Sequence, residues 1–327
     1  MPLLDGQDPR AIERGADLLA AGELLAFPTE TVYGLGARAD RDEAVARIFA
    51  AKGRPHDHPL IVHVADMAAV AEFAASVPEP ARALAARYWP GPMTLILPRR
   101  PDRGAAAAGG QDSIGLRVPA HPVALALLRA CARRGVPGVA GPSANRFGRV
   151  SPTTAAHVVD EFGPALAVLD GGPCQVGIES AIVDCTGERP ALLRPGALSR
   201  VELEATLGAP LGSAHAQSPR ASGTLEAHYA PRARVRLFDA PALRQALAAD
   251  RRPAGLAVYS RLPFAAMPGV AMRAMPDDPA AAAHELFAVL RAFDAGGAET
   301  VWVEVPPPGP EWDGVRDRLT RAAAAAA

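Results

Sequence analysis

Short apolar stretches alternate along the chain with longer segments in which apolar residues recur every three or four positions. The first pattern predicts buried strands and the second predicts amphipathic helices. In the first two hundred residues we expect helices at 10–21, 41–51 and 121–134, and strands at 24–27, 60–64, 93–97, 114–118, 136–140, 166–169, 181–185 and 191–194. The alternation predicts an α/β architecture.

The periodicity disappears between residues 208 and 222, where Gly, Ala, Pro and Ser dominate, as is typical of a linker. Beyond it we expect strands at 234–238, 255–259 and 300–305, and helices at 241–249, 278–293 and 311–322. This order predicts a small, Rossmann-like parallel sheet, but without a GxGxxG turn we assign it no dinucleotide. We therefore predict a first domain over 1–207, a linker or lid over 208–232, and a second α/β domain over 233–327.

The composition is that of an ordinary globular protein: 327 residues, a net charge of −1, 49% hydrophobic and 21% charged residues. That length suffices for two domains. The near-zero charge offers no basic face for tight nucleic-acid binding, so stable binding of tRNA is not expected. No signal peptide or membrane-spanning run is present. Cys131, Cys174 and Cys185 lack metal-ligand spacing, and we expect reduced, partly buried thiols in a cytoplasmic protein with no membrane partner.

The 34 basic residues include a single lysine, Lys52, and the chain has a single asparagine, Asn145. Arginine replaces lysine readily on a solvated surface, but not where a compact, mobile ammonium is required. A chain that uses arginine everywhere else and keeps Lys52 therefore points to lysine-specific chemistry at that position. Chance survival at the end of a helix is the alternative.

Glycine-rich polar motifs follow several strands, which is where open α/β sheets bind ligands. In FPTETVYGLG, Thr31 follows a strand, and Gly34 and Gly36 let the backbone approach a ligand closely. An ordinary capped turn would use the same residue types. Further on, GPSANRFGRVSP offers Ser143, Asn145 and Ser151 around glycines, which favours a phosphate nest but lacks the lysine of a P-loop.

The motif KGRPHDHPLIVH carries Lys52, Arg54, His56, His58 and His63 within twelve residues. A lysine and an arginine together suit a polyanion, one as a point charge and the other as a planar fork. Three histidines also suggest a metal, but no cysteine or carboxylate cluster completes such a site, so we expect no transition metal. We expect His56 to face solvent and prefer His58 and His63 as ligand contacts.

Ser113 and Arg117 lie on one face of a predicted strand, in QDSIGLRVPAHP. Arg117 needs an anion there, and either a ligand or a structural salt bridge would supply it. Past the linker, HYAPRA places His228 and Tyr229 where a flexible segment could fold over a site. No catalytic triad or carboxylate pair stands out. The pattern favours catalysis by positioning and charge stabilisation, without a covalent nucleophile.

Taken together, these motifs resemble the YrdC-like family of threonylcarbamoyl-adenylate synthases in its two-domain form. The motifs that carry the resemblance are FPTETVYGLG, KGRPHDHPLIVH, YWPGPMTLILP, QDSIGLRVPAHPVA, GPSANRFGRVSPT, DGGPCQVGIES, LRPG and HYAPRA, in family order over residues 24–233. The resemblance implies a twisted mixed-sheet α/β domain whose cavity holds threonine and ATP. It implies a cytoplasmic nucleotidyltransferase that uses L-threonine, bicarbonate and ATP, with Mg²⁺ accompanying the ATP, and that hands its product to the transferase complex modifying tRNA.

Carried onto this sequence, the resemblance implies two sets of contacts. Threonine would be surrounded by Thr31, His63, Arg117, Gly141 and Ser180. ATP would be held by Arg54, His58, Ser113, Ser143, Asn145, Ser151, Arg194 and Tyr229, with Lys52 and Arg54 as the catalytic groups at the phosphates. Many relatives have threonine where Ala181 stands, which leaves Ser180 as the hydroxyl at that end.

Two alternatives belong to other classes of protein. Members of this fold have been described as binders of double-stranded RNA, which the neutral charge argues against and a salt-dependent RNA shift assay would detect. The related carbamoyl-transfer domain of hydrogenase maturation lies within a much longer chain with zinc-finger segments, and this sequence contains none.

Overall fold

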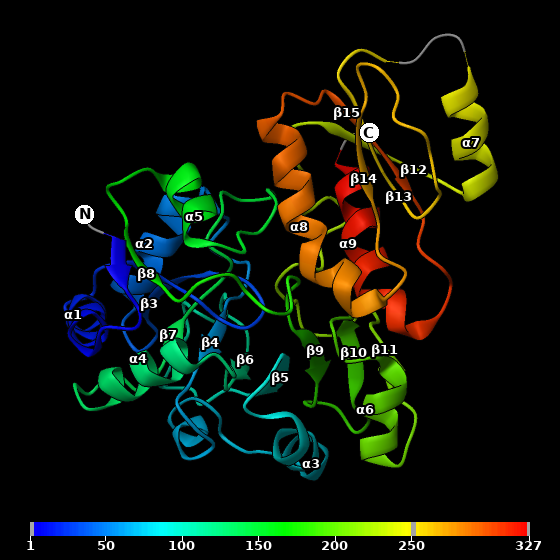
Figure 1. Ribbon diagram of the computed structural model, residues 1–327. Coiled ribbons are helices and arrows are strands. Elements are labelled where there is room, and N and C mark those ends of the chain that lie inside the picture. Colours follow the sequence, from blue (N-terminus) through cyan, green and yellow to red (C-terminus); the bar gives the residue numbers. More distant parts are fainter. Residues whose placement is uncertain (1–2, 250–252, 326–327) are drawn as a thin grey trace.

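The computed structural model describes residues 3–249 and 253–325, and Figure 1 shows them arranged around two sheets. Within these residues, eleven strands form a mixed sheet in the order β1-β8-β2-β3-β7-β4-β6-β5-β9-β10-β11. Four more form a parallel sheet in the order β12-β15-β13-β14. The expected fold class, a mixed-sheet α/β domain with a smaller Rossmann-like one, is confirmed.

The larger sheet and its helices account for the first two thirds of the chain. The strands are β1 (Leu3–Asp5), β2 (Leu25–Phe27), β3 (Gly34–Arg38), β4 (Ile61–His63), β5 (Met93–Pro98), β6 (Ser113–Arg117), β7 (Val139–Ala140), β8 (Ala167–Asp170), β9 (Ala181–Asp184), β10 (Ala191–Arg194) and β11 (Gly212–Ser213). The helices are α1 (Pro9–Ala20), α2 (Asp42–Lys52), the 3-10 helix η1 (Ala68–Glu72), α3 (Glu79–Tyr88), α4 (Pro122–Ala132), α5 (Ala155–Phe162) and α6 (Arg200–Leu207).

Local sequence explains how two of these helices form. Asp8 caps α1 by accepting a hydrogen bond from the backbone of Arg10, and Pro9 occupies the first turn, where its missing N–H costs nothing. The apolar face of α1 packs against α4 and the sheet through Leu19 and Leu127. Helix α2 ends at Lys52 because Gly53 takes the left-handed conformation, with φ of 64°. That ending turns the chain toward the site.

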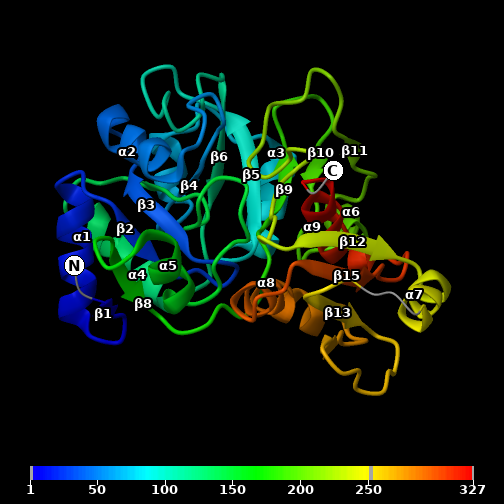
Figure 2. The same cartoon turned by 90° about the horizontal axis from the view of Figure 1, so that it is seen from above.

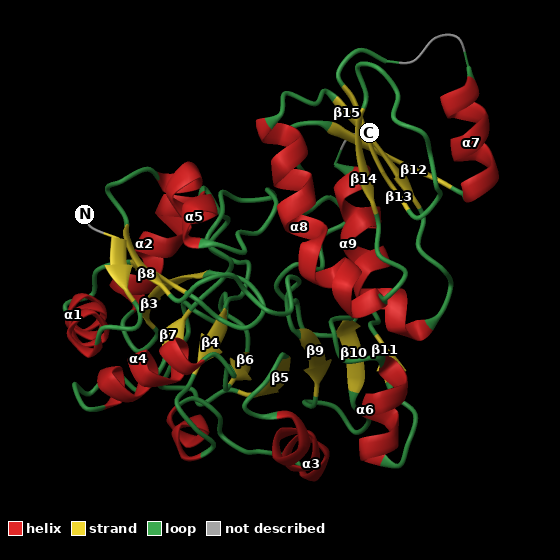
Figure 3. Ribbon diagram, in the orientation of Figure 1, coloured by secondary structure: helices red, strands yellow, loops and turns green. Residues whose placement is uncertain are grey.

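The second sheet carries helices on both faces, as Figures 1 and 3 show. Its elements are β12 (Arg234–Phe238), α7 (Ala240–Ala248), β13 (Leu256–Ser260), β14 (Ala271–Ala274), α8 (Pro279–Ala295), β15 (Thr300–Glu304), the 3-10 helix η2 (Pro310–Trp312) and α9 (Asp313–Ala324). Helix α7 covers one face through Leu243 and Leu247. Helices α8 and α9 lie between the other face and the larger sheet, a layering also visible from above in Figure 2.

The two sheets share an apolar core. Val32, Val150 and Ile178 of the first part of the chain belong to the same buried cluster as Phe287 of α8 and Leu319 of α9. Burial of this surface is the main force that holds the two parts together, because the free energy of burial scales with the apolar area removed from water.

Several elements were not expected from the sequence: β1, β3, α3, α5, α6, β11 and β14. Strand β11 lies within the predicted linker and pairs in parallel with β10. The boundaries at 207 and 232 stay predictions. The three cysteines are free, as expected, but they are fully buried where partial burial was expected. Within the described ranges, no helix has the length and apolarity needed to cross a membrane.

A candidate nucleotide and amino-acid site

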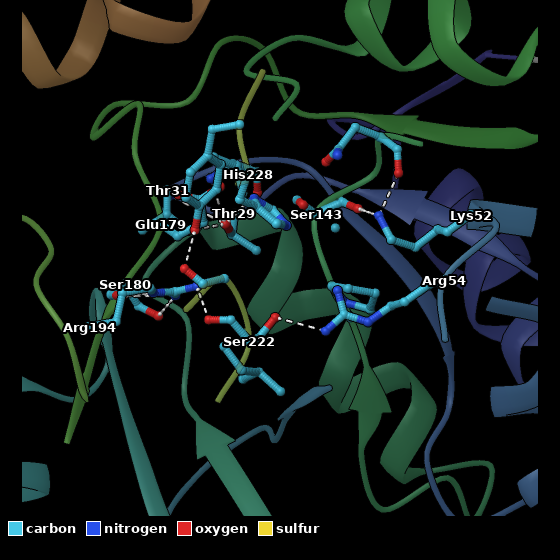
Figure 4. Close-up of a pocket in the computed structure, with 18 of the residues that line it drawn as sticks. Thr29, Thr31, Lys52, Arg54, Ser143, Glu179, Ser180, Arg194, Ser222 and His228 are labelled. Atoms are coloured by element: carbon cyan, nitrogen blue, oxygen red, sulfur yellow. Dashed lines mark hydrogen bonds between the residues drawn. The ribbon is translucent and has the colours of Figure 1, made fainter. Parts of the chain in front are cut away.

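A cavity, partly open to solvent, lies between the larger sheet and residues 222–229. Most of the expected site residues line it: Thr31, Lys52, Arg54, His63, Arg117, Gly141, Ser143, Asn145, Ser180, Arg194 and Tyr229. Figure 4 shows Lys52 and Arg54 on one side and Ser180 and Arg194 across from them.

Sheet topology explains why these residues meet. Strands β4 and β6 are parallel, so their last residues, His63 and Arg117, lie side by side. Strand β5 runs antiparallel to β6 and parallel to β9, which brings the start of β9, directly after Ser180, to the same edge. The site therefore occupies one edge of the sheet and is built from residues far apart in the sequence.

Arg117 is the centre of a buried polar cluster. Its Nη2 pairs with Glu30 Oε1 at 2.6 Å, its Nη1 donates to Thr31 Oγ1 at 3.0 Å, and its Nε donates to the Gly91 carbonyl at 3.1 Å. Thr29 Oγ1 lies 2.8 Å from Thr31 Oγ1. Arg117 therefore forms a structural salt bridge and also lines the cavity. Three of the five N–H donors are engaged with described residues, which leaves donors for a carboxylate.

His63 is buried beside Arg117. Burial, with the positive charge of Arg117, lowers the pKa of His63 to about 3, so the ring is neutral near pH 7. Its edge meets Phe27, with ring centroids 5.6 Å apart. A Cβ at Gly141 would lie 3.0 Å from both His63 Nδ1 and Phe27 Cζ, which is tighter than an ordinary contact, so glycine lets the backbone approach the ring without displacing it.

Ser180 and Arg194 form the opposite wall. The hydroxyl of Ser180 lies 2.8 Å from that of Thr94, and Arg194 donates to the Ser180 carbonyl through Nε at 3.1 Å and Nη2 at 2.9 Å. Arg194 Nη1 donates to the carbonyl of Ser222 at 2.8 Å. Arg194 thus ties the predicted linker to the wall that carries Ser180.

Lys52 is 3% exposed, and its ammonium donates to the main-chain carbonyls of Ser143 and Asn145, each at 2.5 Å. Burial, reinforced by the charge of Arg54, lowers the pKa of Lys52 well below its ordinary value. An ammonium has three donors, and one remains for a ligand in the cavity. Lys52 therefore holds the Ser143–Asn145 loop and faces the cavity at the same time.

The side chain of Asn145 is fixed in orientation. Its Nδ2 donates to the carbonyls of Arg146 at 2.7 Å and Arg149 at 2.9 Å. Its Oδ1 is buried and has no hydrogen-bond partner among the described residues. A residue that lines the cavity therefore carries a fixed oxygen acceptor without a partner among the described residues.

Arg54 lies across the cavity from the sheet. Its Nη2 donates to the Pro59 carbonyl at 2.9 Å and lies 3.4 Å from the Ser222 hydroxyl, and its guanidinium stacks 5.6 Å from the Phe147 ring centroid. Burial lowers the pKa of Arg54 to about 10, so the group stays cationic at neutral pH.

Three expected residues lie outside the lining of the main cavity. His58 lines a neighbouring hollow together with Arg54, and its pKa is lowered by burial and by the Arg54 charge. Ser113 lines a second hollow near Ser222. Ser151 is fully buried, and its hydroxyl donates to Glu179 behind the wall. His56 is exposed, as expected.

Tyr229 closes one side of the cavity in an unusual backbone conformation. Its φ is 61°, the one positive φ outside glycine among the described residues, and such strain costs on the order of 1–3 kcal/mol. Its ring stacks on Phe287, with centroids 5.6 Å apart, and contacts His228 at 4.2 Å. Burial lowers the pKa of His228 to about 3. The predicted lid is thus packed into the shared core.

Sequence reasoning did not select Glu30, Glu179 or Ser222 for the site. Both glutamates are buried, and each pairs with an arginine far away in the sequence. Their position inside the motifs FPTETVYGLG and DGGPCQVGIES was the available signal. Ser222 carried no signal, because it lies in a low-complexity stretch.

A mixed α/β sheet with arginine and lysine side chains lining a cavity at one edge is typical of enzymes that act on anionic substrates. A family model described as "Telomere recombination", for Sua5, YciO and YrdC proteins, matches residues 17–196. A second, described as "Threonylcarbamoyl-AMP synthase, C-terminal domain", matches residues 198–324.

Proteins of similar sequence and a similar solved structure indicate the same family as these two models. The chain is 44% identical to a threonylcarbamoyl-AMP synthase of Bacillus subtilis over 70% of this chain and 67% of that protein. It is 33% identical to one of Schizosaccharomyces pombe over 96% of this chain and 88% of that protein. The crystal structure of Pyrococcus abyssi Sua5 complexed with L-threonine matches with a TM-score of 0.88 and 34% identity over 98% of this chain and 96% of that one. The chain belongs to the threonylcarbamoyl-AMP synthase family, in its two-domain form.

Proposed function

We propose that this chain makes threonylcarbamoyl-AMP and pyrophosphate from L-threonine, bicarbonate and ATP. One observation carries the proposal: a single cavity gathers a hydroxyl and arginine cluster around Arg117 and a cationic cluster around Lys52. The first cluster suits an amino-acid carboxylate and hydroxyl, and the second suits phosphates. Family membership supports the same reaction, and the threonine bound to the Pyrococcus abyssi relative supports the amino acid.

The reaction has two bond-forming steps. The threonine amine attacks the carbon of bicarbonate, a C–N bond forms, and water leaves to give a carbamate. A carbamate oxygen then attacks the α-phosphorus of ATP, the bond from that phosphorus to the bridging oxygen of the β-phosphate breaks, and pyrophosphate leaves with the electron pair. No covalent bond to the protein forms, so this site acts by positioning and by stabilising charge.

We assign each end of the cavity its role. Thr31, His63, Arg117, Gly141 and Ser180 surround threonine, with neutral His63 as a hydrogen-bonding group. Lys52 and Arg54 stabilise the charge that develops at the phosphates, with Ser143, Asn145, Arg194 and Tyr229 around the nucleotide. His58 and Ser113, in the adjoining hollows, would reach it at its outer parts. Ser151 acts on the nucleotide side through Glu179.

Magnesium enters as part of the ATP substrate. No cluster of three or more His, Cys, Asp or Glu side chains suited to a metal occurs within the described ranges. Mg²⁺ on a nucleotide keeps phosphate oxygens and waters as most of its ligands and needs little protein oxygen. The fixed, unpartnered Oδ1 of Asn145 fits that demand, and it is the protein oxygen that would hold the cation.

That assignment has a readout apart from synthesis. Calorimetric titration of ATP with and without Mg²⁺ gives the factor by which the cation tightens nucleotide binding. Asn145→Ala should reduce this factor roughly tenfold, as loss of a metal-site ligand or its supporting partner does. An unchanged factor in the variant would remove Asn145 from the cation.

The decisive test of the function is incorporation of radiolabelled bicarbonate into an acid-labile nucleotide product, with ATP and each amino acid in turn. Threonine-dependent incorporation with equimolar pyrophosphate is expected. Incorporation with another amino acid would change the substrate, and none with any would end the proposal. Addition of a tRNA-modifying transferase and tRNA then tests whether the product is handed on.

A further inference from the structure

Arg318 of α9 reaches from the second domain to the wall of the cavity. It is 1% exposed, and its Nε pairs with Glu179 Oε2 at 2.9 Å. Its Nη2 donates to the Glu179 carbonyl at 3.1 Å, and its Nη1 donates to the Pro195 carbonyl at 2.8 Å and pairs with Asp317. A buried guanidinium with this many partners has one available position, because losing any partner leaves a buried polar group unpaired.

Because Arg318 fixes the position of Glu179, it also fixes the site residues that Glu179 contacts. Its side chain lines the cavity, it accepts a hydrogen bond from the Ser151 hydroxyl, and it directly precedes Ser180. Arg318 also lies over the ring of Tyr229, with Cζ 5.2 Å from the centroid, a cation–π contact. Arg318, a single side chain of the second domain, therefore contacts both Glu179 and Tyr229, which line the cavity.

Helices α8 and α9 both contact the main chain near Glu179, α8 at Gly177 and α9 at Gly196. A side chain at Gly177 would come within 2.3 Å of the His284 carbonyl in α8, and one at Gly314 in α9 within 2.6 Å of the Gly196 carbonyl. Main chain touches main chain at both places. The segment that carries Glu179 is thus held by α8 before it and by α9 beyond it.

The electrostatics agree with a charged Glu179. Burial alone would raise its pKa, but the charges of Arg318 and Arg194, with hydrogen bonds from Ser151 and Arg318, lower the pKa below its ordinary value. The charged or titratable groups around this carboxylate are Arg318 and Asp317 of α9, Arg194 of β10, Lys52 of α2, and His228 and Tyr229 of the predicted linker.

We propose that Arg318 is a positioning residue for synthesis: it fixes Glu179, the Ser151 hydroxyl and the Tyr229 ring, so the second domain completes the active site. This inference rests on the proposed function and assigns the second domain a direct part in it. Threonine remains bound by residues of the first part of the chain, so the effect falls on nucleotide use and on the chemical step.

The test uses full-length variants of an active wild-type protein, so failure of wild-type synthesis would count against the function and not against Arg318. Arg318→Gln should lower kcat/KM for ATP about a hundredfold, as loss of one partner of a buried pair does, with a much smaller change in threonine affinity. Glu179→Gln should behave alike, and the double variant should be no worse than either single one, because both act through one contact.

The pH profile gives a readout that a purely structural role would not move. In Arg318→Gln, loss of the neighbouring positive charge raises the pKa of Glu179, so the acidic limb of the activity profile should shift to higher pH. Glu179→Gln should remove that limb.

Arg261→Gln is the matched control. It removes a guanidinium that pairs at 2.7 Å with the buried Glu304 of β15, and neither residue lines the cavity. It should lower stability while leaving the kinetics and pH profile of the folded enzyme unchanged. Arg318→Gln with wild-type kinetics, or with losses matched by Arg261→Gln at equal folded fraction, would overturn the proposal.

Discussion

Arg117 and Glu30 form an ion pair at 2.6 Å with both side chains almost fully buried, at the inner end of the cavity. Each residue therefore depends on the other: the carboxylate aligns the guanidinium, and the guanidinium gives the buried carboxylate a hydrogen-bonding partner. A substrate carboxylate that joins this pair meets a guanidinium already held in place, so little conformational entropy is lost on binding.

The first prediction concerns this pair. Arg117→Leu should raise the threonine concentration needed for half-maximal synthesis far more than the ATP concentration, because removing a desolvated charge partner costs on the order of 2–5 kcal/mol. Initial rates measured over both substrates give the two values. Glu30→Gln is the matched variant, and it should weaken threonine binding less, since the cation remains. Equal losses for both substrates in Arg117→Leu would show that Arg117 is structural.

The second prediction is that Lys52→Arg keeps the fold and loses most synthesis. The ammonium sits between two carbonyls at 2.5 Å, and a guanidinium is too broad and planar to keep both contacts and still face the phosphates. We expect a fall in kcat of at least about a hundredfold, the scale of one lost electrostatic contact to a transition state. Thermal unfolding controls for the fold. Near-wild-type turnover would mean that Lys52 persists by chance.

The third prediction concerns the predicted linker. Hydrogen exchange through residues 209–231 should slow when ATP and threonine are added together, because the segment packs over the cavity through Ser222 and Tyr229. Tyr229→Ala should still fold and should release less intact product, since an adenylate exposed to water is hydrolysed. If protection across the segment does not change with ligands, Tyr229 has no closing role.

The fourth prediction is a pH dependence of stability. The pKa of His63 is about 3 in the folded protein against an ordinary 6.5, so between these values the unfolded chain binds more protons. Stability is therefore fully present above pH 6.5 and falls as the pH drops toward 3, by about 1.4 kcal/mol per pH unit for one such group. Urea unfolding at pH 4.5 and 6.5 measures it. His63→Gln should flatten the slope by about one proton, and an unchanged slope would refute the assignment.

Spacing of apolar residues was enough to predict the strongly periodic elements, such as α1, α4 and three strands of the second sheet, β12, β13 and β15. It missed β3, because the two glycines of Gly34–Arg38 favour a ligand loop and only Leu35 and Ala37 carry the apolar alternation. It also missed α6, although Ser199 and Glu202 form a capping box that the sequence displays. Elements of that kind are specified by caps and by tertiary contacts.

Residues of the candidate site could be predicted from the sequence where their residue type is conspicuous. Lys52 stood out as the one lysine, and the glycine-rich motifs stood out around Thr31 and Ser143. Glu179 and Arg318 are 139 positions apart, and nothing local to either one indicates the other. Long-range pairs of this kind follow from how the two sheets dock, and no periodicity carries that information.

The apolar cluster shared by the two sheets has a consequence for the molecule as a whole. Val32, Val150 and Ile178 are buried only while α8 and α9 stay docked, and Phe287 is covered only while Tyr229 stays in place. Neither half can melt without exposing the interior of the other, which makes the chain one cooperative unit despite its two sheets. If one half were replaced by that of a distant relative, its side chains would not fit those of the other half in the shared apolar cluster. We therefore expect the two halves to change together over evolution.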